Sequence, residues 1–203
     1  ISISAVILTL ITASIILGGV KRISQISMVI VPFMAIAYVS AAVFILAINA
    51  DKIPATISLI IRAAFDPQAA VGGVVGFTVL KAIQSGVARG IFSNEAGLGS
   101  APIAAAAAHT KEPVRQGLIS MTGVFLYTIL VCTMTGLVIV MTGVWNGPTS
   151  GAALTNLAFS EGLGSSIGAI IVTVSLIFFA YTTILGWCYY GERCFVYLTK
   201  GKT

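Results

Sequence analysis

The sequence predicts an all-α membrane protein with about five crossings, one of them made by a broken helix. Of its 203 residues, 58% are hydrophobic and 8% are charged, and the mean hydropathy is +1.05. Apolar windows long enough to cross a hydrocarbon core recur along the chain, and cations gather between alternate windows. Because so few charges cannot cover a water-facing surface, we expect the lipid bilayer to contact most of the protein.

Each apolar window is expected to be a helix, and one window is too long for a single straight crossing. The predicted helices, within a single transmembrane region of residues 1–203, are 1–20, 26–48, 69–109, 117–145 and 167–190. A short amphipathic helix is expected around Ala55–Ala64, in an external loop. Residues 146–165 are polar and Gly-rich, which predicts a loop before the last helix.

The distribution of positive charge predicts how these helices are oriented. If the Lys21–Arg22 pair is cytoplasmic, alternate crossings place seven cations on that side and only Lys52 and Arg62 on the other. This arrangement requires window 69–109 to cross once, as two half-helices. The chain opens at Ile1 inside an apolar window, so we also expect it to be the middle of a longer chain.

Residues 86–102 carry the polar groups that interrupt the overlong window. The run Ser93-Asn94-Glu95 is flanked by glycines, and ionisable residues at membrane depth are costly unless they are functional or paired. We expect the helix to break near residues 92–100, so that freed backbone groups face a cavity. The alternative is a packing segment in which small residues allow close approach and Glu95 pairs with Arg89.

Several other classes of protein are disfavoured. No basic stripe with interleaved aromatic residues occurs, so nucleic acid is not an expected partner. The three cysteines, Cys132, Cys188 and Cys194, have no CxxC spacing and are expected to be buried, reduced thiols. An intramembrane hydrolase would need a nucleophile and a base on facing elements, but Ser100 and His109 share one segment and no HExxH motif occurs. We therefore expect no enzyme activity.

Motifs along the whole chain point to one family. They are Gly19–Arg22, Val31–Met34, Phe65–Ala70, the long run Gly86–Ala108, Arg115–Gly117, Thr133–Gly136, Thr182–Trp187 and Tyr189–Arg193. In these motifs the chain resembles the sodium:alanine/glycine symporter family. The resemblance implies part of an inverted-repeat bundle of the leucine-transporter (LeuT) type, multi-pass in the plasma (inner) membrane. It also implies import of alanine or glycine with sodium by alternating access, with sodium as the coupling ion and no other cofactor.

The resemblance also implies which residues bind the two solutes. The amino-acid site would be lined by Phe92, Ser93, Asn94, Gly97, Gly99 and Ser100. The hydroxyls of Thr182 and Thr183 would ligate sodium, a hard cation that takes oxygen ligands; the alternative is that they bond back to carbonyls of their own helix. Two alternative functions stay open. One is a proton-coupled permease of the same fold, with Glu95 as a candidate proton carrier, and the other is a non-transporting membrane subunit.

Overall fold

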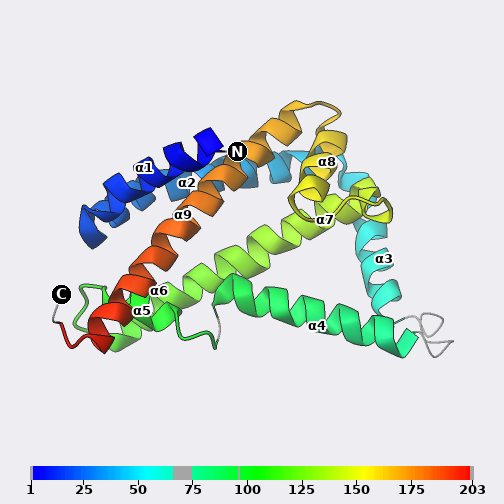
Figure 1. Cartoon of the computed structure of the whole chain (residues 1–203). Coiled ribbons are helices and arrows are strands. Elements are labelled where there is room, and N and C mark those ends of the chain that lie inside the picture. Colours follow the sequence, from blue (N-terminus) through cyan, green and yellow to red (C-terminus); the bar gives the residue numbers. More distant parts are fainter. Residues whose placement is uncertain (1, 66–74, 96, 202–203) are drawn as a thin grey trace. The chain divides into compact units, whose positions relative to one another are not determined.

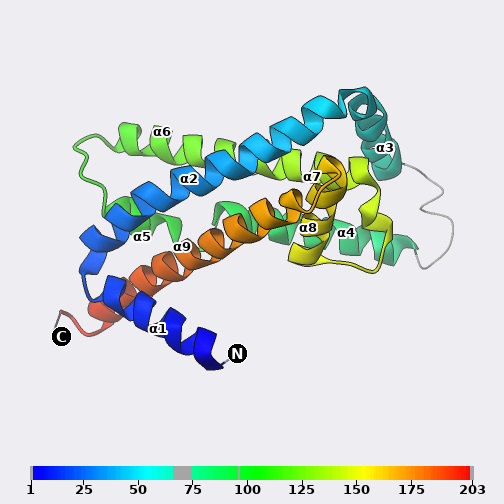
Figure 2. The same cartoon turned by 90° about the horizontal axis from the view of Figure 1, so that it is seen from above.

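The computed structural model describes residues 2–65, 75–95 and 97–201, and within them every regular element is a helix (Figures 1 and 2). The elements are α1 (Ser2–Ile16), α2 (Gly19–Ile48), η1 (Ala50–Lys52), α3 (Ile53–Phe65), α4 (Val75–Asn94), α5 (Ala101–Ala106), α6 (Pro113–Val124), η3 (Phe125–Cys132), α7 (Thr133–Thr142), η4 (Val144–Asn146), α8 (Gly151–Leu163) and α9 (Ile167–Leu198). The predicted all-α class is confirmed over these residues.

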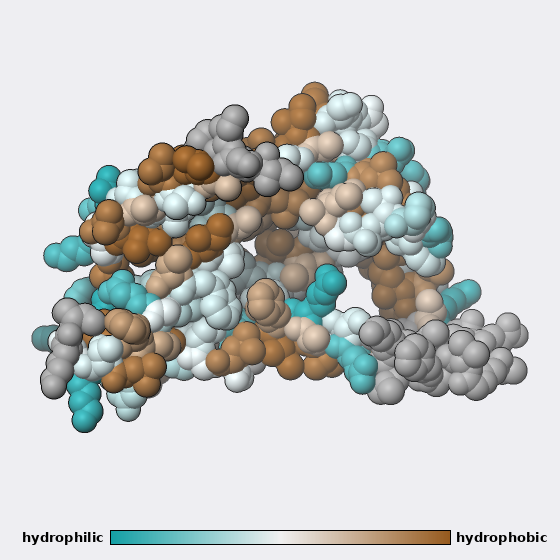
Figure 3. Space-filling view, viewed as in Figure 1, coloured by the Kyte–Doolittle hydropathy of each residue, from teal (hydrophilic) through white to brown (hydrophobic). Residues whose placement is uncertain are grey.

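Three helical rods among the described residues are long and apolar enough to cross a membrane. They are Gly19–Ile48, Pro113–Thr142 and Ile167–Leu198. Helix α1 has 15 residues, fewer than the roughly 20 that a crossing needs, and α4 carries Lys81, Gln84 and Arg89. Large apolar side chains lie exposed on the surface, as the brown areas of Figure 3 show. A membrane protein is therefore supported, while the count of five crossings stays a prediction.

The first compact unit comprises residues 1–40 and 170–203. It contains α1, most of α2 and most of α9. Within it, the rings of Tyr38 and Phe179 meet edge to face with their centroids 6.1 Å apart. Met34 on α2 and Leu185 on α9 are buried. Apolar packing of this kind holds the long helices of the unit together.

The second compact unit comprises residues 41–169. Helices α6, η3 and α7 follow one another without a break as a single rod, Pro113–Thr142, whose middle segment η3 is π-helical. The C-terminal part of this rod packs against α3 and α8, and Val138 and Phe159 are buried there. The π-helical middle packs against α4. This unit holds the interrupted helix.

Residues 146–165, predicted to be a loop, contain helix α8, so that prediction is wrong for Gly151–Leu163. The glycines that indicated a loop serve packing and helix termination instead. A Cβ at Gly162 would approach Ile45 Cγ2 to 2.7 Å, so the glycine allows α8 to pack closely against the end of α2. Gly164, with a φ of +61°, adopts the left-handed conformation that ends the helix. Glycine content alone does not separate these roles.

Helix boundaries differ from the expected ones near the start of the chain. The turn between α1 and α2 lies at Leu17 and Gly18, so Lys21 and Arg22 belong to the first turns of α2 and do not end the preceding helix. The amphipathic helix expected at Ala55–Ala64 lies within α3. The predicted start of the third window, at residue 69, lies outside the described residues.

Candidate functional site

Helix α4 ends at Asn94, and α5 begins at Ala101. Between them Gly97 and Gly99 have φ values of +75° and +78°, a left-handed conformation that glycine adopts without steric cost. Glu95 has a φ of +55°, which costs a non-glycine residue on the order of 1–2 kcal/mol. The regular helical hydrogen-bond ladder therefore stops over these residues. Pro102 lies in the first turn of α5, where its missing N–H is tolerated.

Two side chains in the last turn of α4 reach the π-helical segment η3. The Thr128 hydroxyl donates a hydrogen bond to Asn94 Oδ1 over 2.9 Å. One residue earlier, Ser93 Oγ lies 4.0 Å from Cys132 Sγ, at the outer limit for a hydrogen bond that involves sulfur. The structure thus brings Ser93 and Asn94 together with residues of a second helix that lie 39 and 34 residues further along the chain, respectively.

The other residues predicted to line the site have different surroundings. Phe92 is exposed, with 64% of its surface accessible, and Gly97 and Gly99 have open space where a Cβ would stand. Ser100 is only 6% exposed, and its hydroxyl has no hydrogen-bond partner among the described residues. A buried hydroxyl usually has a partner, so Ser100 can still bind a polar group that is not part of the described structure.

Thr182 and Thr183 lie on α9, in the first unit. Thr182 Oγ1 donates to the carbonyls of Phe178 and Phe179 over 3.0 and 3.1 Å, and Thr183 Oγ1 donates to that of Phe179 over 2.8 Å. Both hydroxyls thus make the backbone bonds that the alternative interpretation describes. A hydroxyl that donates its hydrogen keeps two lone pairs, so it can still coordinate a cation. The sodium role stays a prediction.

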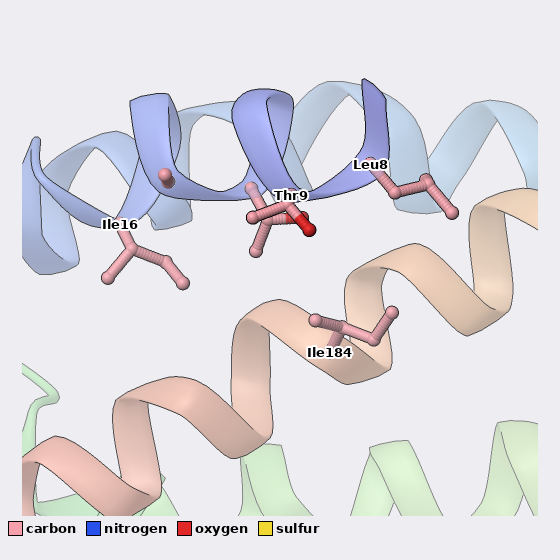
Figure 4. A pocket seen from close by; sticks show the side chains of 6 residues that line it. Leu8, Thr9, Ile16 and Ile184 are labelled. Carbon is pink, nitrogen blue, oxygen red and sulfur yellow. The ribbon is translucent and has the colours of Figure 1, made fainter. Parts of the chain in front are cut away.

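A groove between α1 and α9 in the first unit is unsuited to an amino acid. Its volume is about 400 Å³, and Figure 4 shows Leu8, Thr9 and Ile16 facing Ile184. The residues that line it carry no charge, and the Thr9 hydroxyl already donates to the Ala5 carbonyl over 2.8 Å. A zwitterion moved into this groove would leave both its charged groups poorly compensated.

The cysteines were expected to be buried, but Cys132 and Cys194 are exposed. Sequence reasoning also missed Thr128 and Cys132 as residues that contact the end of α4. Both lie in a window without charged residues, which predicted only a membrane-crossing helix. Threonines recur along that window, at positions 122, 128, 133, 135 and 142, so hydroxyl content did not distinguish one of them. The distinguishing features are a π-helical backbone and a contact across 34 residues, and neither has a signal in local composition.

Comparison with known proteins gives a consistent result over nearly the whole chain. The model of a family described as the sodium:alanine symporter family matches residues 2–203. An uncharacterised transporter of Haemophilus influenzae is 71% identical over 197 residues, 97% of this chain and 43% of its own length. The sodium/alanine symporter AgcS of Methanococcus maripaludis is 50% identical over 205 residues, 98% of this chain and 44% of its own.

A third relative has a name that gives a different coupling ion. It is a sodium/proton-dependent alanine carrier protein of Bacillus sp. (strain PS3), 35% identical over 202 residues, which are 92% of this chain and 44% of that protein. The chain therefore spans less than half the length of the curated relatives that it matches. The matching proteins are transporters, in agreement with the expectation that the chain is no enzyme.

Proposed function

Because this chain belongs to the sodium:alanine symporter family, we propose that the full-length protein imports a small neutral amino acid, alanine or glycine, together with sodium. The proposal includes alternating access within an inverted-repeat bundle of the LeuT type. It also includes five crossings of the plasma (inner) membrane by this part of the chain. The name of the Methanococcus maripaludis relative supports alanine as the substrate and sodium as the ion.

The observation that carries this proposal is the interruption between α4 and α5. Left-handed Glu95, Gly97 and Gly99 remove the backbone from the helical ladder. In a membrane, such irregular backbone is tolerated where it lines a cavity or is buried in protein. We assign the amino-acid site to this segment, with Phe92, Ser93, Asn94, Gly97, Gly99 and Ser100 as its lining.

The dimensions of this lining favour a small substrate. Gly97 and Gly99 add no side chain to the wall, and each would be strained by one. Asn94 and Ser100 supply an amide and a buried hydroxyl that can bind the ionised groups of an amino acid. For sodium we propose hydroxyl ligation by Thr182 and Thr183 on α9, completed by oxygen ligands from outside this chain.

The test is uptake of labelled alanine and glycine by the full-length protein in liposomes. We expect accumulation under an inward sodium gradient and none when potassium replaces sodium. Asn94→Ala should lower alanine uptake at least tenfold while protein incorporation into the liposomes is unchanged. Gln116→Ala, on the first turn of α6, is the matched control and should transport like the wild type. A wild type that takes up neither alanine nor glycine would contradict the proposal.

Proton coupling is the second candidate, and one observation favours it. The Bacillus relative is named a sodium/proton-dependent alanine carrier, so its name includes protons beside sodium. In that case uptake would persist without sodium and would follow an imposed pH gradient. If uptake requires sodium whatever pH gradient is imposed, coupling to protons without sodium is excluded. A wild type that binds alanine but does not transport it would indicate a non-transporting subunit.

A further inference from the structure

The π-helical segment η3 offers the proposed site something that an ordinary helix does not. Several threonines in described α-helices donate back to a carbonyl one turn earlier, as Thr122 does to Leu118 over 2.9 Å and Thr135 to Val131 over 2.8 Å. In η3 the backbone bonds run from residue i to i+5, so the carbonyl four residues back has a different position. There the Thr128 hydroxyl donates to Asn94 on α4.

This bond determines which part of the Asn94 amide remains available. A side-chain amide has one oxygen acceptor and two N–H donors. Thr128 donates to one of the two lone pairs of Oδ1, and Nδ2 donates to no residue that the structure describes. Asn94 is half-buried and is the last residue of α4 before the interruption. Its Nδ2 donors therefore lie beside the segment where the backbone leaves the helix.

We infer that Thr128 is a positioning residue that holds the Asn94 amide so that its Nδ2 hydrogens donate to the carboxylate of the transported amino acid. This inference rests on the proposed function, because it needs an amino acid bound at the interruption. A carboxylate is an acceptor without hydrogens, so it matches the two N–H donors of an amide whose oxygen is held by the Thr128 hydroxyl. Ser93, the residue before Asn94, contacts Cys132 and so adds a second contact between α4 and η3.

The first measurement is sodium-driven alanine uptake by the full-length protein with Thr128→Val, Thr128→Ser or Thr122→Val. Valine keeps the shape of threonine but cannot donate, so Thr128→Val should raise the KM for alanine about five- to tenfold, with the maximal rate within twofold. Serine restores the donor and should restore the KM. Thr122→Val removes a hydroxyl that bonds its own helix and should leave both constants unchanged.

The second measurement identifies the group that Asn94 presents. Asn94→Asp keeps an oxygen for Thr128 but replaces the N–H donors with a second oxygen, which repels a carboxylate. We expect its KM for alanine to exceed that of Asn94→Ala by at least threefold. If Asn94 instead accepted from the substrate ammonium, Asn94→Asp would transport as well as the wild type or better.

The outcomes separate the inference from the proposed function. A wild type without sodium-dependent amino-acid uptake would contradict the proposed function itself. A wild type that transports, with a Thr128→Val variant of unchanged KM, would overturn only the positioning role. A Thr128→Ser variant as impaired as Thr128→Val would also overturn it, because restoring the hydroxyl donor would then not restore the KM.

Discussion

Two regions of the molecule present the same kinds of polar side chain in opposite ways. On α9, Thr182 and Thr183 sit in an unbroken helix of 32 residues, and their hydroxyls donate to carbonyls of that helix. At the end of α4 the helix is interrupted, and Ser93 and Asn94 reach a different helix. In a regular helix, hydroxyl side chains can donate to carbonyls of the same helix. Where a helix is interrupted or π-helical, polar side chains become available to other partners.

Substitution at the interruption should have the largest effect. Gly99→Val places a β-branched side chain at a φ of +78° and adds bulk to the proposed wall. We expect alanine uptake by the full-length protein to fall more than twentyfold. Gly117→Val, at an exposed helical glycine of α6 with open space around it, is the matched control. If Gly99→Val takes up alanine as fast as an unimpaired Gly117→Val, the left-handed glycine is not needed for transport.

Substitution on α9 tests whether a hydroxyl that bonds its own helix can also serve an ion. Thr183→Val removes one proposed sodium ligand, and we expect the sodium concentration for half-maximal uptake to rise about tenfold. The maximal rate at saturating sodium should change less than twofold. Thr199→Val is a matched control, because Thr199 also donates to a carbonyl of α9, that of Phe195 over 2.9 Å. If both variants have the sodium dependence of the wild type, the Thr183 hydroxyl serves only its helix.

The smallest effect is expected at Ser100. Its buried hydroxyl has no partner in the described part of the chain, so removing it breaks no bond to those residues. If it binds substrate, Ser100→Ala should raise the KM for alanine about three- to fivefold, consistent with loss of one hydrogen bond. Thermal stability of the purified protein should stay the same or rise slightly. An unchanged KM would remove Ser100 from the site.

The sequence predicted the all-α class, which is confirmed over the described residues, and the family, which is confirmed by the family match. It was wrong about Gly151–Leu163, where glycine content indicated a loop and the structure has a helix. The error has a physical cause, since a glycine that breaks a helix and a glycine that allows two helices to pack closely look the same in local composition. Only the approach of Ile45 to Gly162 distinguishes them.

By itself, the sequence determined that this chain belongs in a membrane, because its few charges and long apolar windows leave no other solvent that suits its surface. It also indicated where polar residues collect, between Phe92 and Ser100. The tertiary structure alone decided which of these side chains meet a partner and how. The contact between Asn94 and Thr128 joins residues 34 apart through a π-helical turn, and hydrogen bonds between distant segments have no counterpart in hydropathy or spacing.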